Sequence, residues 1–346
     1  MSKIIRTLIV DDSAFVRKTV REMLTRSPYI EVVGTARDGE EALEMVEELR
    51  PDVVTCDLMM PRLDGVGFVR QQMSRRPIPI LILTASPQDA GLVLEALSAG
   101  AVDLVQKPTA LATEELLRIR EQLVEKVKTA ARVPVANLVT TNRTESLFAP
   151  SRLGGGLKVD LVVLGISTGG PQALRHLLPE FPANFPVPLL MVLHMPVGYT
   201  APFAEKLDEL SQVEVAEARD GTALRPGLAL LAQAGRHLSL RRDLHGAVVA
   251  QVSMNPIDRT HRPSVDVLFQ SAADVYGPRV LGVVMTGMGD DGKEGAGWIK
   301  AQGGMILTEA ESSCVIYGMP RSVVEAGLSD RAVPLLKMTE TILQCL

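Results

Sequence analysis

The stretch "LVVLGISTGGP", residues 161–171, joins an apolar run to a turn rich in glycine and small hydroxyl residues. An apolar run of this kind is typical of a buried strand, and the glycines after it predict a tight turn into a helix. A strand that leads through a tight turn into a helix is the repeating unit of α/β folds. The turn fits two kinds of site, because a bound phosphate group and a serine nucleophile both need close access to the backbone.

The phosphate-site interpretation lacks its main chemical group. Gly165 and Gly170 have the G-x-x-x-x-G spacing of a phosphate-binding loop, but Pro171 and Gln172 follow where such a loop carries Lys and Ser or Thr. The same turn satisfies G-x-S-x-G with Ser167 at its centre, the pattern in which a strand-to-helix turn exposes a serine hydroxyl. A Ser-Thr pair that caps the following helix explains the same residues, so a nucleophile needs further support.

A serine nucleophile requires a base, and the base requires an acid that orients it. Among the five histidines, His194 ends the strand-like run "VPLLMVLH", at a carboxyl edge like that of Ser167. The segment "TGMGDDG" follows a third apolar run and offers Asp290 and Asp291, which could also cap the helix after them. The chain order Ser, His, Asp is acceptable because such triads are defined by geometry. These residues predict a Ser-His-Asp site.

Alternation of strand and helix patterns divides the chain into two α/β domains. In the second, residues 157–346, "VDLVVLGI", "VPLLMVLH" and "RVLGVVMTG" are expected strands, each followed by a helix, and residues 227–252 are expected to form a β-hairpin. Residues 129–156 contain prolines, many Ser, Thr and Asn residues and a glycine triplet, which predicts a linker. Within it, "VPVANLV" also fits a further strand.

The first domain, residues 1–128, alternates five strand-like runs with amphipathic segments. The runs are "IIRTLIV", "EVVGTA", "DVVTCDL", "IPILILTA" and "AVDLVQK". Such repeats predict an open parallel sheet with helices on both faces, of the doubly wound kind that binds ligands beyond the carboxyl ends of its strands.

Polar side chains close four of these strand-like runs. Asp11 and Asp12 end the first run, Asp57 the third, Thr84 the fourth and Lys107 the fifth. Each aspartate alone is explained by helix capping, but all five residues at one edge of a sheet favour a phosphate site. Carboxylate oxygens suit Mg²⁺, and a lysine with a hydroxyl would orient a phosphoryl group.

Composition and charge exclude several other classes. The 346 residues are 46% apolar and 22% charged, as in ordinary globular proteins, and the net charge of −5 lacks the basic excess of a nucleic-acid binder. No apolar run approaches the roughly 18 residues of a membrane span, and the N-terminus does not fit a signal peptide. Three widely separated cysteines form neither a disulfide framework nor a zinc motif. We expect a cytoplasmic protein without membrane insertion.

The motifs "VDDS", "DLMMPRLDG", "TA" and "KP" stand in the order of the receiver domain of two-component response regulators, which residues 1–128 resemble throughout. The resemblance implies a flavodoxin-like fold in which Asp57 accepts a phosphoryl group from a histidine kinase. It implies that Asp11 and Asp12, with Asp57, hold Mg²⁺. Thr84 and Lys107 are then expected to sense the phosphate.

Two residues depart from the receiver pattern. Leu104 stands where receivers normally carry an aromatic switch residue, which puts the usual relay from threonine to the aromatic ring in doubt. Met59 replaces a polar side chain beside the phosphoryl group. An apolar side chain cannot orient an attacking water, so we expect a changed lifetime of the phosphate.

The motifs "GISTGGP", "VLHMP", "HRPSVDVLF", "TGMGDDG" and "VIYGMPRSV" resemble the catalytic domain of the CheB family of chemotaxis protein-glutamate methylesterases, across residues 157–346. A receiver joined by a linker to this domain is the arrangement of that family. The resemblance implies Ser167 as nucleophile, His194 as base and Asp291 as orienting acid. The backbone N–H of Met288 and the region of Thr168 are candidates for the oxyanion site.

Together the two resemblances imply a phosphorylation-activated enzyme of chemotactic adaptation. It would hydrolyse γ-glutamyl methyl esters on chemoreceptors, release methanol and deamidate receptor glutamines, without a cofactor for this hydrolysis. A chemotaxis histidine kinase is the implied phosphodonor, and recruitment to receptor arrays at the membrane is expected. The unphosphorylated receiver is expected to restrict access to the catalytic face. The alternative is a phosphorylation-controlled adaptor that binds receptors without catalysis, and the intact Ser-His-Asp set argues against it.

Overall fold

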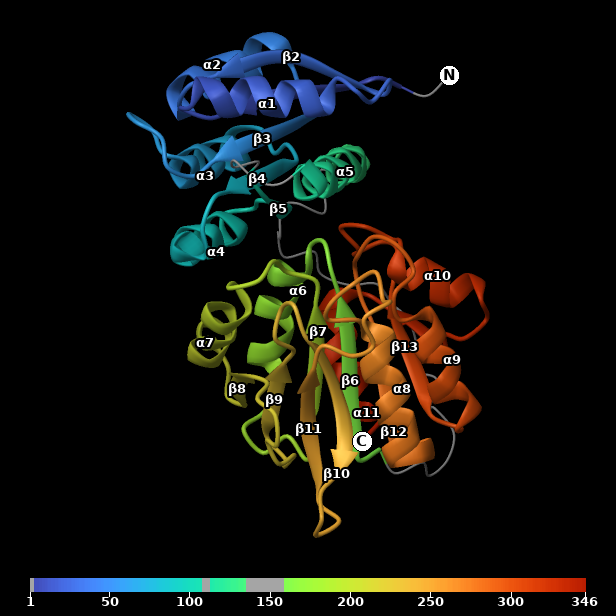
Figure 1. The fold of residues 1–346 in the computed structure, drawn as a ribbon. Helices are drawn as coiled ribbons and strands as arrows, with labels where there is room; N and C mark the ends of the chain where they lie inside the picture. Colours follow the sequence, from blue (N-terminus) through green and yellow to red (C-terminus); the bar gives the residue numbers. More distant parts are fainter. Residues whose placement is uncertain (1–2, 108–112, 135–158) are drawn as a thin grey trace. The chain divides into compact units, whose positions relative to one another are not determined.

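The computed structural model describes residues 3–107, 113–134 and 159–346 of the chain, drawn as a ribbon in Figure 1. The chain divides into two compact units, Met1–Thr140 and Thr141–Leu346. Among the described residues, no helix is both long and apolar enough to cross a membrane. Most of the predicted linker, including the larger part of "VPVANLV", lies outside the described residues.

The N-terminal unit contains a sheet of five parallel strands in the order β2-β1-β3-β4-β5. Its strands are β1 (Ile5–Val10), β2 (Ile30–Ala36), β3 (Val53–Asp57), β4 (Ile80–Thr84) and β5 (Asp103–Gln106). Its helices are α1 (Ala14–Leu24), α2 (Gly39–Leu49), α3 (Gly65–Arg75), α4 (Ala90–Ser98) and α5 (Thr113–Ala130). Every residue of β3 and β4 is buried, as expected of central strands in a sheet that helices cover. The predicted strand–helix alternation is confirmed.

The C-terminal unit contains seven parallel strands in the order β14-β13-β12-β6-β7-β9-β8, and a separate antiparallel hairpin of β10 and β11. The strands are β6 (Leu161–Ile166), β7 (Leu189–Leu193), β8 (Glu214–Glu217), β9 (Leu228–Leu231), β10 (His237–Arg242), β11 (Val248–Ser253), β12 (Val280–Val284), β13 (Met305–Glu309) and β14 (Arg331–Val333). The helices are α6 (Gly170–Leu177), α7 (Thr200–Leu210), α8 (Val265–Tyr276), α9 (Lys293–Ala301), α10 (Met319–Glu325) and α11 (Leu335–Gln344). The hairpin lies beside α8 (Figure 1).

The predicted hairpin over residues 227–252 is only partly correct. Its first apolar run, Leu228–Leu231, is β9, which pairs in parallel with β7 and β8 in the main sheet. The hairpin itself begins at His237, where β10 pairs with β11. The run was assigned to the hairpin because it is adjacent in sequence, but all four of its side chains are buried, as the interior of a parallel sheet requires.

Gly165, near the carboxyl end of β6, allows α8 to pack directly on the sheet. A Cβ atom at this position would lie 2.3 Å from Cγ1 of Val265, the first residue of α8. Val265 is fully buried against the strand. The amino terminus of α8 is therefore held next to the turn that contains Ser167.

Candidate active site and phosphoacceptor site

Three carboxylates and one lysine meet beyond the carboxyl ends of the receiver-like sheet. Lys107 Nζ lies 2.9 Å from Asp11 Oδ2 and 2.8 Å from Asp57 Oδ2. Asp11 and Asp57 are buried and Asp12 is exposed, and one oxygen atom from each of the three lies within 4.8 Å of the others. This spacing of oxygen ligands fits a single hard cation such as Mg²⁺.

The charges in this cluster do not balance. Burial raises the pKa of Asp57, and Lys107 opposes that shift only in part. Burial would lower the pKa of Lys107, but its hydrogen bonds to Asp57 and Asp11 outweigh this effect and raise it. One ammonium group faces three carboxylates, so a divalent cation would neutralise the excess negative charge. The residues present fit the predicted Mg²⁺.

The other receiver residues lie around this cluster. The backbone N–H of Lys107 donates to the carbonyl of Thr84 at 2.7 Å, and the Thr84 side chain is buried at the end of β4. Leu104 is buried within β5, so the position of the usual aromatic switch is part of the core. Met59 is 60% exposed, two residues after Asp57.

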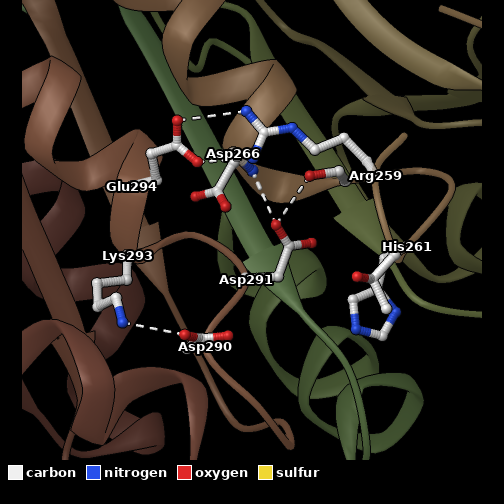
Figure 2. Close-up of a pocket in the computed structure, with 9 residues that line it drawn as sticks. Arg259, His261, Asp266, Asp290, Asp291, Lys293 and Glu294 are labelled. Atoms are coloured by element: carbon white, nitrogen blue, oxygen red, sulfur yellow. Dashed lines mark hydrogen bonds and ion pairs between the residues drawn. The ribbon is translucent and has the colours of Figure 1, made fainter. Parts of the chain in front are cut away.

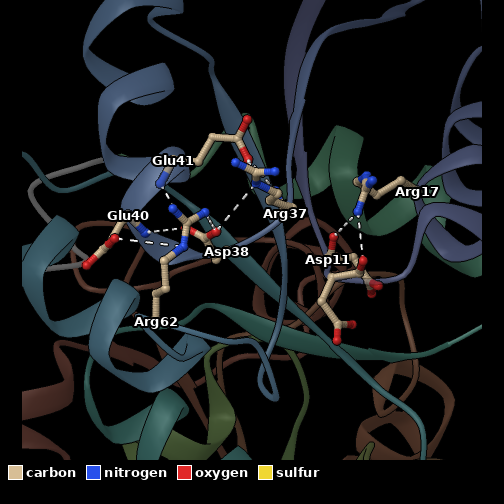
Figure 3. A network of polar contacts seen from close by, with 8 residues as sticks. Asp11, Arg17, Arg37, Asp38, Glu40, Glu41 and Arg62 are labelled. Carbon is tan, nitrogen blue, oxygen red and sulfur yellow. Dashed lines mark hydrogen bonds and ion pairs between the residues drawn. The ribbon is translucent and has the colours of Figure 1, made fainter.

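The loop after Asp57 is anchored by an ion pair that the sequence analysis did not identify. Arg62, in the left-handed region at φ 63°, pairs with the fully buried carboxylate of Asp38 (Figure 3). Asp38 also accepts the backbone N–H groups of Glu40 and Glu41 at 3.0 Å and so caps α2. The contact ties the loop between β3 and α3 to the amino terminus of α2.

The Ser167 turn in the C-terminal unit has the predicted form. Gly169 adopts φ 80°, in the left-handed region that favours glycine, and α6 begins at Gly170. The N–H of Ser167 donates to the carbonyl of Thr286 at 2.9 Å, which fixes the turn to the loop after β12. Ser167 itself is half-buried.

His194 and Asp291 lie within hydrogen-bond distance of each other. His194 follows β7 directly, next to β6, which ends at Ile166 just before Ser167, and its Nε2 lies 2.8 Å from Asp291 Oδ2. Because the carboxylate can only accept, Nε2 carries the proton and Nδ1 is left as the basic nitrogen. Nδ1 is buried and has no hydrogen-bond partner among the described residues, Ser167 included. Catalytic hydrogen bonds of this kind often tighten only when substrate binds.

Asp291 is held by four hydrogen bonds. Its Oδ2 accepts from His194 Nε2 and from the N–H of Val265, both at 2.8 Å. Its Oδ1 accepts from Ser264 Oγ at 2.8 Å and from the N–H of Asp266 at 3.1 Å. Burial would raise the pKa of Asp291, but these donors, with His194 foremost, outweigh it and hold the pKa well below its usual range. The carboxylate therefore stays ionised beside the imidazole.

Asp291 caps a different helix from the one that the sequence suggested. It binds the amino terminus of α8, which precedes it in the chain, rather than that of α9, which follows. The cap of α9 is Asp266, whose Oδ1 accepts the N–H groups of Gly292 at 2.9 Å and Gly295 at 2.7 Å. Burial raises the pKa of Asp266 to about 6. Asp290 is exposed and pairs with Lys293.

Two further histidines, His237 and His261, contact this site. The ring of His261 stacks on that of His194, with centroids 4.2 Å apart and an angle of 13° between the planes. His237 is buried, accepts the N–H of Ser264 at Nδ1 (3.2 Å) and donates from Nε2 to the carbonyl of Pro256 (3.0 Å). Burial lowers the pKa of His237, so it remains neutral and positions Ser264.

A cavity opens beside the His194–Asp291 pair, and Figure 2 shows its charged lining. Arg259 forms a two-point ion pair with Glu294, at 2.6 and 3.3 Å, on one side of the cavity. His261 and Asp291 also line it. Charged side chains of both signs therefore line this cavity, whereas Ser167 and His194 are not among its lining residues.

The two oxyanion candidates lie on loops that contact each other. The carbonyl of Thr168 accepts a hydrogen bond from Thr286 Oγ1 at 3.0 Å. Met288, half-buried, follows Gly287, whose carbonyl accepts the N–H groups of Gly318 at 3.1 Å and Met319 at 2.8 Å. The loop that carries Met288 is thus held between the Ser167 turn and the start of α10.

Comparisons with known proteins agree with this geometry. Residues 162–342 match the family model of the CheB methylesterase, and residues 7–119 match that of the response regulator receiver domain. The chain is 51% identical to protein-glutamate methylesterase/protein-glutamine glutaminase 5 of Myxococcus xanthus, over 96% of this chain and 95% of that protein. It is 42% identical to a protein-glutamate methylesterase/protein-glutamine glutaminase of Symbiobacterium thermophilum, over 98% and 96% of the two chains.

A solved structure supports the assignment of the C-terminal unit. The crystal structure of the Thermotoga maritima CheB methylesterase catalytic domain superposes with a TM-score of 0.53 and 38% identity, over 55% of this chain and all of that one. The chain therefore belongs to the CheB family, with a response regulator receiver domain followed by a CheB methylesterase domain.

Proposed function

We propose that this chain hydrolyses γ-glutamyl methyl esters on chemoreceptors, with Ser167 as nucleophile, His194 as base and Asp291 as the orienting acid. The observation that carries the proposal is the 2.8 Å hydrogen bond between His194 and Asp291 beside the Ser167 turn. The names of the relatives, protein-glutamate methylesterases/protein-glutamine glutaminases, support the same chemistry.

In the first step, Ser167 Oγ attacks the ester carbonyl while His194 Nδ1 takes its proton. The ionised Asp291 stabilises the imidazolium that forms, and the N–H of Met288 with a donor near Thr168 would stabilise the oxyanion. His194 then protonates the departing methoxide, so methanol leaves. Water hydrolyses the acyl-enzyme by the reverse proton transfers and restores a glutamate and free Ser167.

A glutamine side chain presents an amide carbonyl to the same groups. Attack by Ser167 gives the same acyl-enzyme, and His194 protonates the leaving group, which is ammonia instead of methanol. Deamidation of receptor glutamines is therefore the second activity we propose, and no cofactor enters either reaction.

The receiver domain is proposed to control this activity. Asp57 would accept a phosphoryl group from a chemotaxis histidine kinase, and Asp11 and Asp12 would complete with it the site for Mg²⁺, whose charge offsets that of the phosphoryl group. Thr84 and Lys107 would then contact the phosphate. Phosphorylation would shift the protein towards arrangements in which the catalytic face is accessible. Such a protein would act in the cytoplasm at receptor arrays.

Methanol release from membranes that contain methylated receptors tests the catalytic proposal. Ser167→Ala and His194→Ala are expected to abolish release, and His245→Ala, which changes an exposed histidine in the β10–β11 turn, is the matched control. Equal release by wild type and Ser167→Ala would favour the adaptor alternative.

Activation is tested separately with a small phosphodonor such as acetyl phosphate and Mg²⁺. Wild type should release methanol faster after this treatment, whereas Asp57→Asn should not respond. A response of equal size in Asp57→Asn would show that Asp57 is not the controlling residue.

A further inference from the structure

One buried ionisable side chain of the C-terminal domain has no part in the reaction described above. Glu309, the last residue of β13, is fully buried, and no basic side chain among the described residues forms an ion pair with it. Its Oε2 accepts the N–H of Thr286 at 2.9 Å, and its Oε1 accepts Ser313 Oγ at 2.9 Å. A buried carboxyl group without a neighbouring cation lowers stability unless hydrogen bonds compensate its loss of hydration. The residues that form these hydrogen bonds therefore indicate the role of Glu309.

Thr286, the first of these partners, connects Glu309 to the nucleophile. The Thr286 carbonyl accepts the N–H of Ser167 at 2.9 Å, and its hydroxyl donates to the carbonyl of Thr168 at 3.0 Å. The same hydroxyl accepts the N–H of Ile316 at 2.9 Å. Both residues of the nucleophile turn are therefore fixed by Thr286, whose own N–H is fixed by Glu309.

Ser313, the second partner, connects Glu309 to the loop between β13 and α10. Ser313 Oγ accepts the N–H of Leu335 at 3.0 Å and lies 3.3 Å from the carbonyl of Ala310. The far end of this loop holds the carbonyl of Gly287 through the N–H of Gly318. Glu309 thus bonds both the loop that carries Met288, at Thr286, and the loop before α10, at Ser313.

We propose that Glu309 is a positioning residue, which holds Ser167 and the Met288 loop in register through Thr286, and that it does so by hydrogen bonding rather than by charge. A neutral side chain of the same shape still accepts the N–H of Thr286 and still bonds Ser313. In a glutamine, the amide oxygen accepts the N–H of Thr286 and the amide NH₂ donates to Ser313 Oγ. The Ser313 hydroxyl then donates its own proton to the carbonyl of Ala310. Burial, which raises the pKa of Glu309 to about 7, agrees with a site that tolerates the neutral form. The inference rests on the proposed esterase function.

Two variants of similar size separate hydrogen bonding from charge. Glu309→Gln keeps an acceptor for Thr286 and a donor for Ser313, so kcat for methanol release should stay within about threefold of wild type. Glu309→Met removes both, and because a small misplacement at a nucleophile costs up to about 100-fold, kcat should fall about 10- to 100-fold with KM unchanged.

A matched control on the same strand separates positioning from general destabilisation. Thr308 is equally buried, and its hydroxyl bonds only Ser329 Oγ, at 2.8 Å, among the described residues. Thr308→Ala should lower stability, followed by the fluorescence of Trp298, the single tryptophan of the chain, while kcat stays within about twofold. If Glu309→Met does not fold, Ser313→Ala replaces it and should lower kcat several-fold at constant KM.

Several results would overturn the inference. An unchanged kcat in the folded Glu309→Met or Ser313→Ala variant would show that Thr286 needs no such support. A Glu309→Gln variant as slow as Glu309→Met would show that charge is required. An equal loss of kcat in Thr308→Ala would reduce Glu309 to a structural residue. Failure of the esterase proposal itself is recognised independently, because Ser167→Ala would then release methanol like wild type.

Discussion

Asp291 and Asp266 cap neighbouring helices, but they distribute the backbone N–H groups differently over their two oxygens. Replacement by asparagine is therefore expected to lower stability at Asp291 and to leave it nearly unchanged at Asp266. Asp291 takes one backbone N–H on each oxygen, from Val265 and from Asp266. Asp266 takes both of its backbone N–H groups, from Gly292 and Gly295, on Oδ1 alone. An asparagine has a single acceptor oxygen, so it can replace Asp266 but not Asp291.

The cost of Asp291→Asn follows from this count. Whichever way the amide turns, one buried backbone N–H at the start of α8 faces an NH₂ group, which costs about 1–3 kcal/mol. Loss of the negative charge at the helix amino terminus adds about 0.3–1 kcal/mol. The total of about 1–4 kcal/mol should lower the Tm of the methylesterase domain by roughly 3–16 °C. In Asp266→Asn, whose carboxyl has a pKa raised to about 6 by burial, a neutral amide removes an unfavourable charge, so the change should be near zero or slightly stabilising.

Trp298 makes the measurement specific, because the single tryptophan of the chain lies in α9 of the methylesterase domain. Thermal unfolding followed by its fluorescence at neutral pH compares wild type, the two asparagine variants and Ser167→Ala, which should unfold like wild type. Asp291→Asn should also lose activity on the order of 10⁴-fold, since the imidazole loses its orienting charge. Equal Tm losses in the two asparagine variants, or no loss in Asp291→Asn, would refute the capping argument.

Three further predictions follow from other contacts. Burial raises the pKa of Glu309 from 4.5 to about 7, so the folded state binds more protons than the unfolded state between these two pH values. The free energy of unfolding should therefore fall by about 3 kcal/mol as pH rises through this window. In urea titrations at about pH 5 and pH 8, the fall in stability should be smaller by about this amount in Glu309→Gln than in wild type, and an equal fall in the two proteins would contradict the prediction. Asp57→Asn, which removes one of three carboxylates, should weaken Mg²⁺ binding on the order of tenfold by titration calorimetry, and an unchanged affinity would exclude Asp57 as a ligand. Arg62→Ala and Arg62→Gly both lose the ion pair with Asp38, but residue 62 has a φ of 63°, which favours glycine. The glycine variant should therefore be more stable than the alanine variant by about 1 kcal/mol in calorimetry of the receiver domain, and the reverse order of stability would contradict this prediction.

The long apolar runs of the sequence predicted the central strands of both sheets, because burial on two faces leaves a strong local pattern. The edge strands of the C-terminal sheet, β8 and β14, were not predicted, and neither was its inner strand β13. β8 is four residues long with one fully buried side chain, and β14 is three residues long, so neither carries a readable periodicity. β9 was assigned to the hairpin, because partner choice in a sheet depends on residues far away in the chain.

The candidate site was predicted in part for a similar reason. Strand ends and turn motifs indicated His194 and Asp291, and the structure places them in contact. The partners of Asp291 lie 25 to 27 residues earlier, at the start of α8, and only the packing of that helix on β6 brings them close. Ser264 stands inside the recognised motif "HRPSVDVLF", so a polar side chain just before a helix was the available signal. Glu309 left none, because a glutamate at the end of an unpredicted strand resembles a surface residue.

Each of the two domains places a buried aspartate near the carboxyl ends of its parallel strands, and the pKa values of these two aspartates are shifted in opposite directions. In the receiver, Asp57 Oδ2 contacts Lys107 and Oδ1 accepts the backbone N–H of Leu58 at 2.7 Å, and the backbone N–H of Met59 also stabilises the carboxylate. Burial raises the pKa of Asp57, so the negative charge of its carboxylate remains incompletely stabilised and available to a cation and an electrophilic phosphorus. Asp291 is surrounded by four donors that hold its pKa low, which makes it a weak nucleophile and a strong orienting group for His194. The balance of burial against N–H and O–H donors therefore raises the pKa of Asp57 and lowers that of Asp291, as the proposed roles of phosphoryl acceptor and orienting acid require.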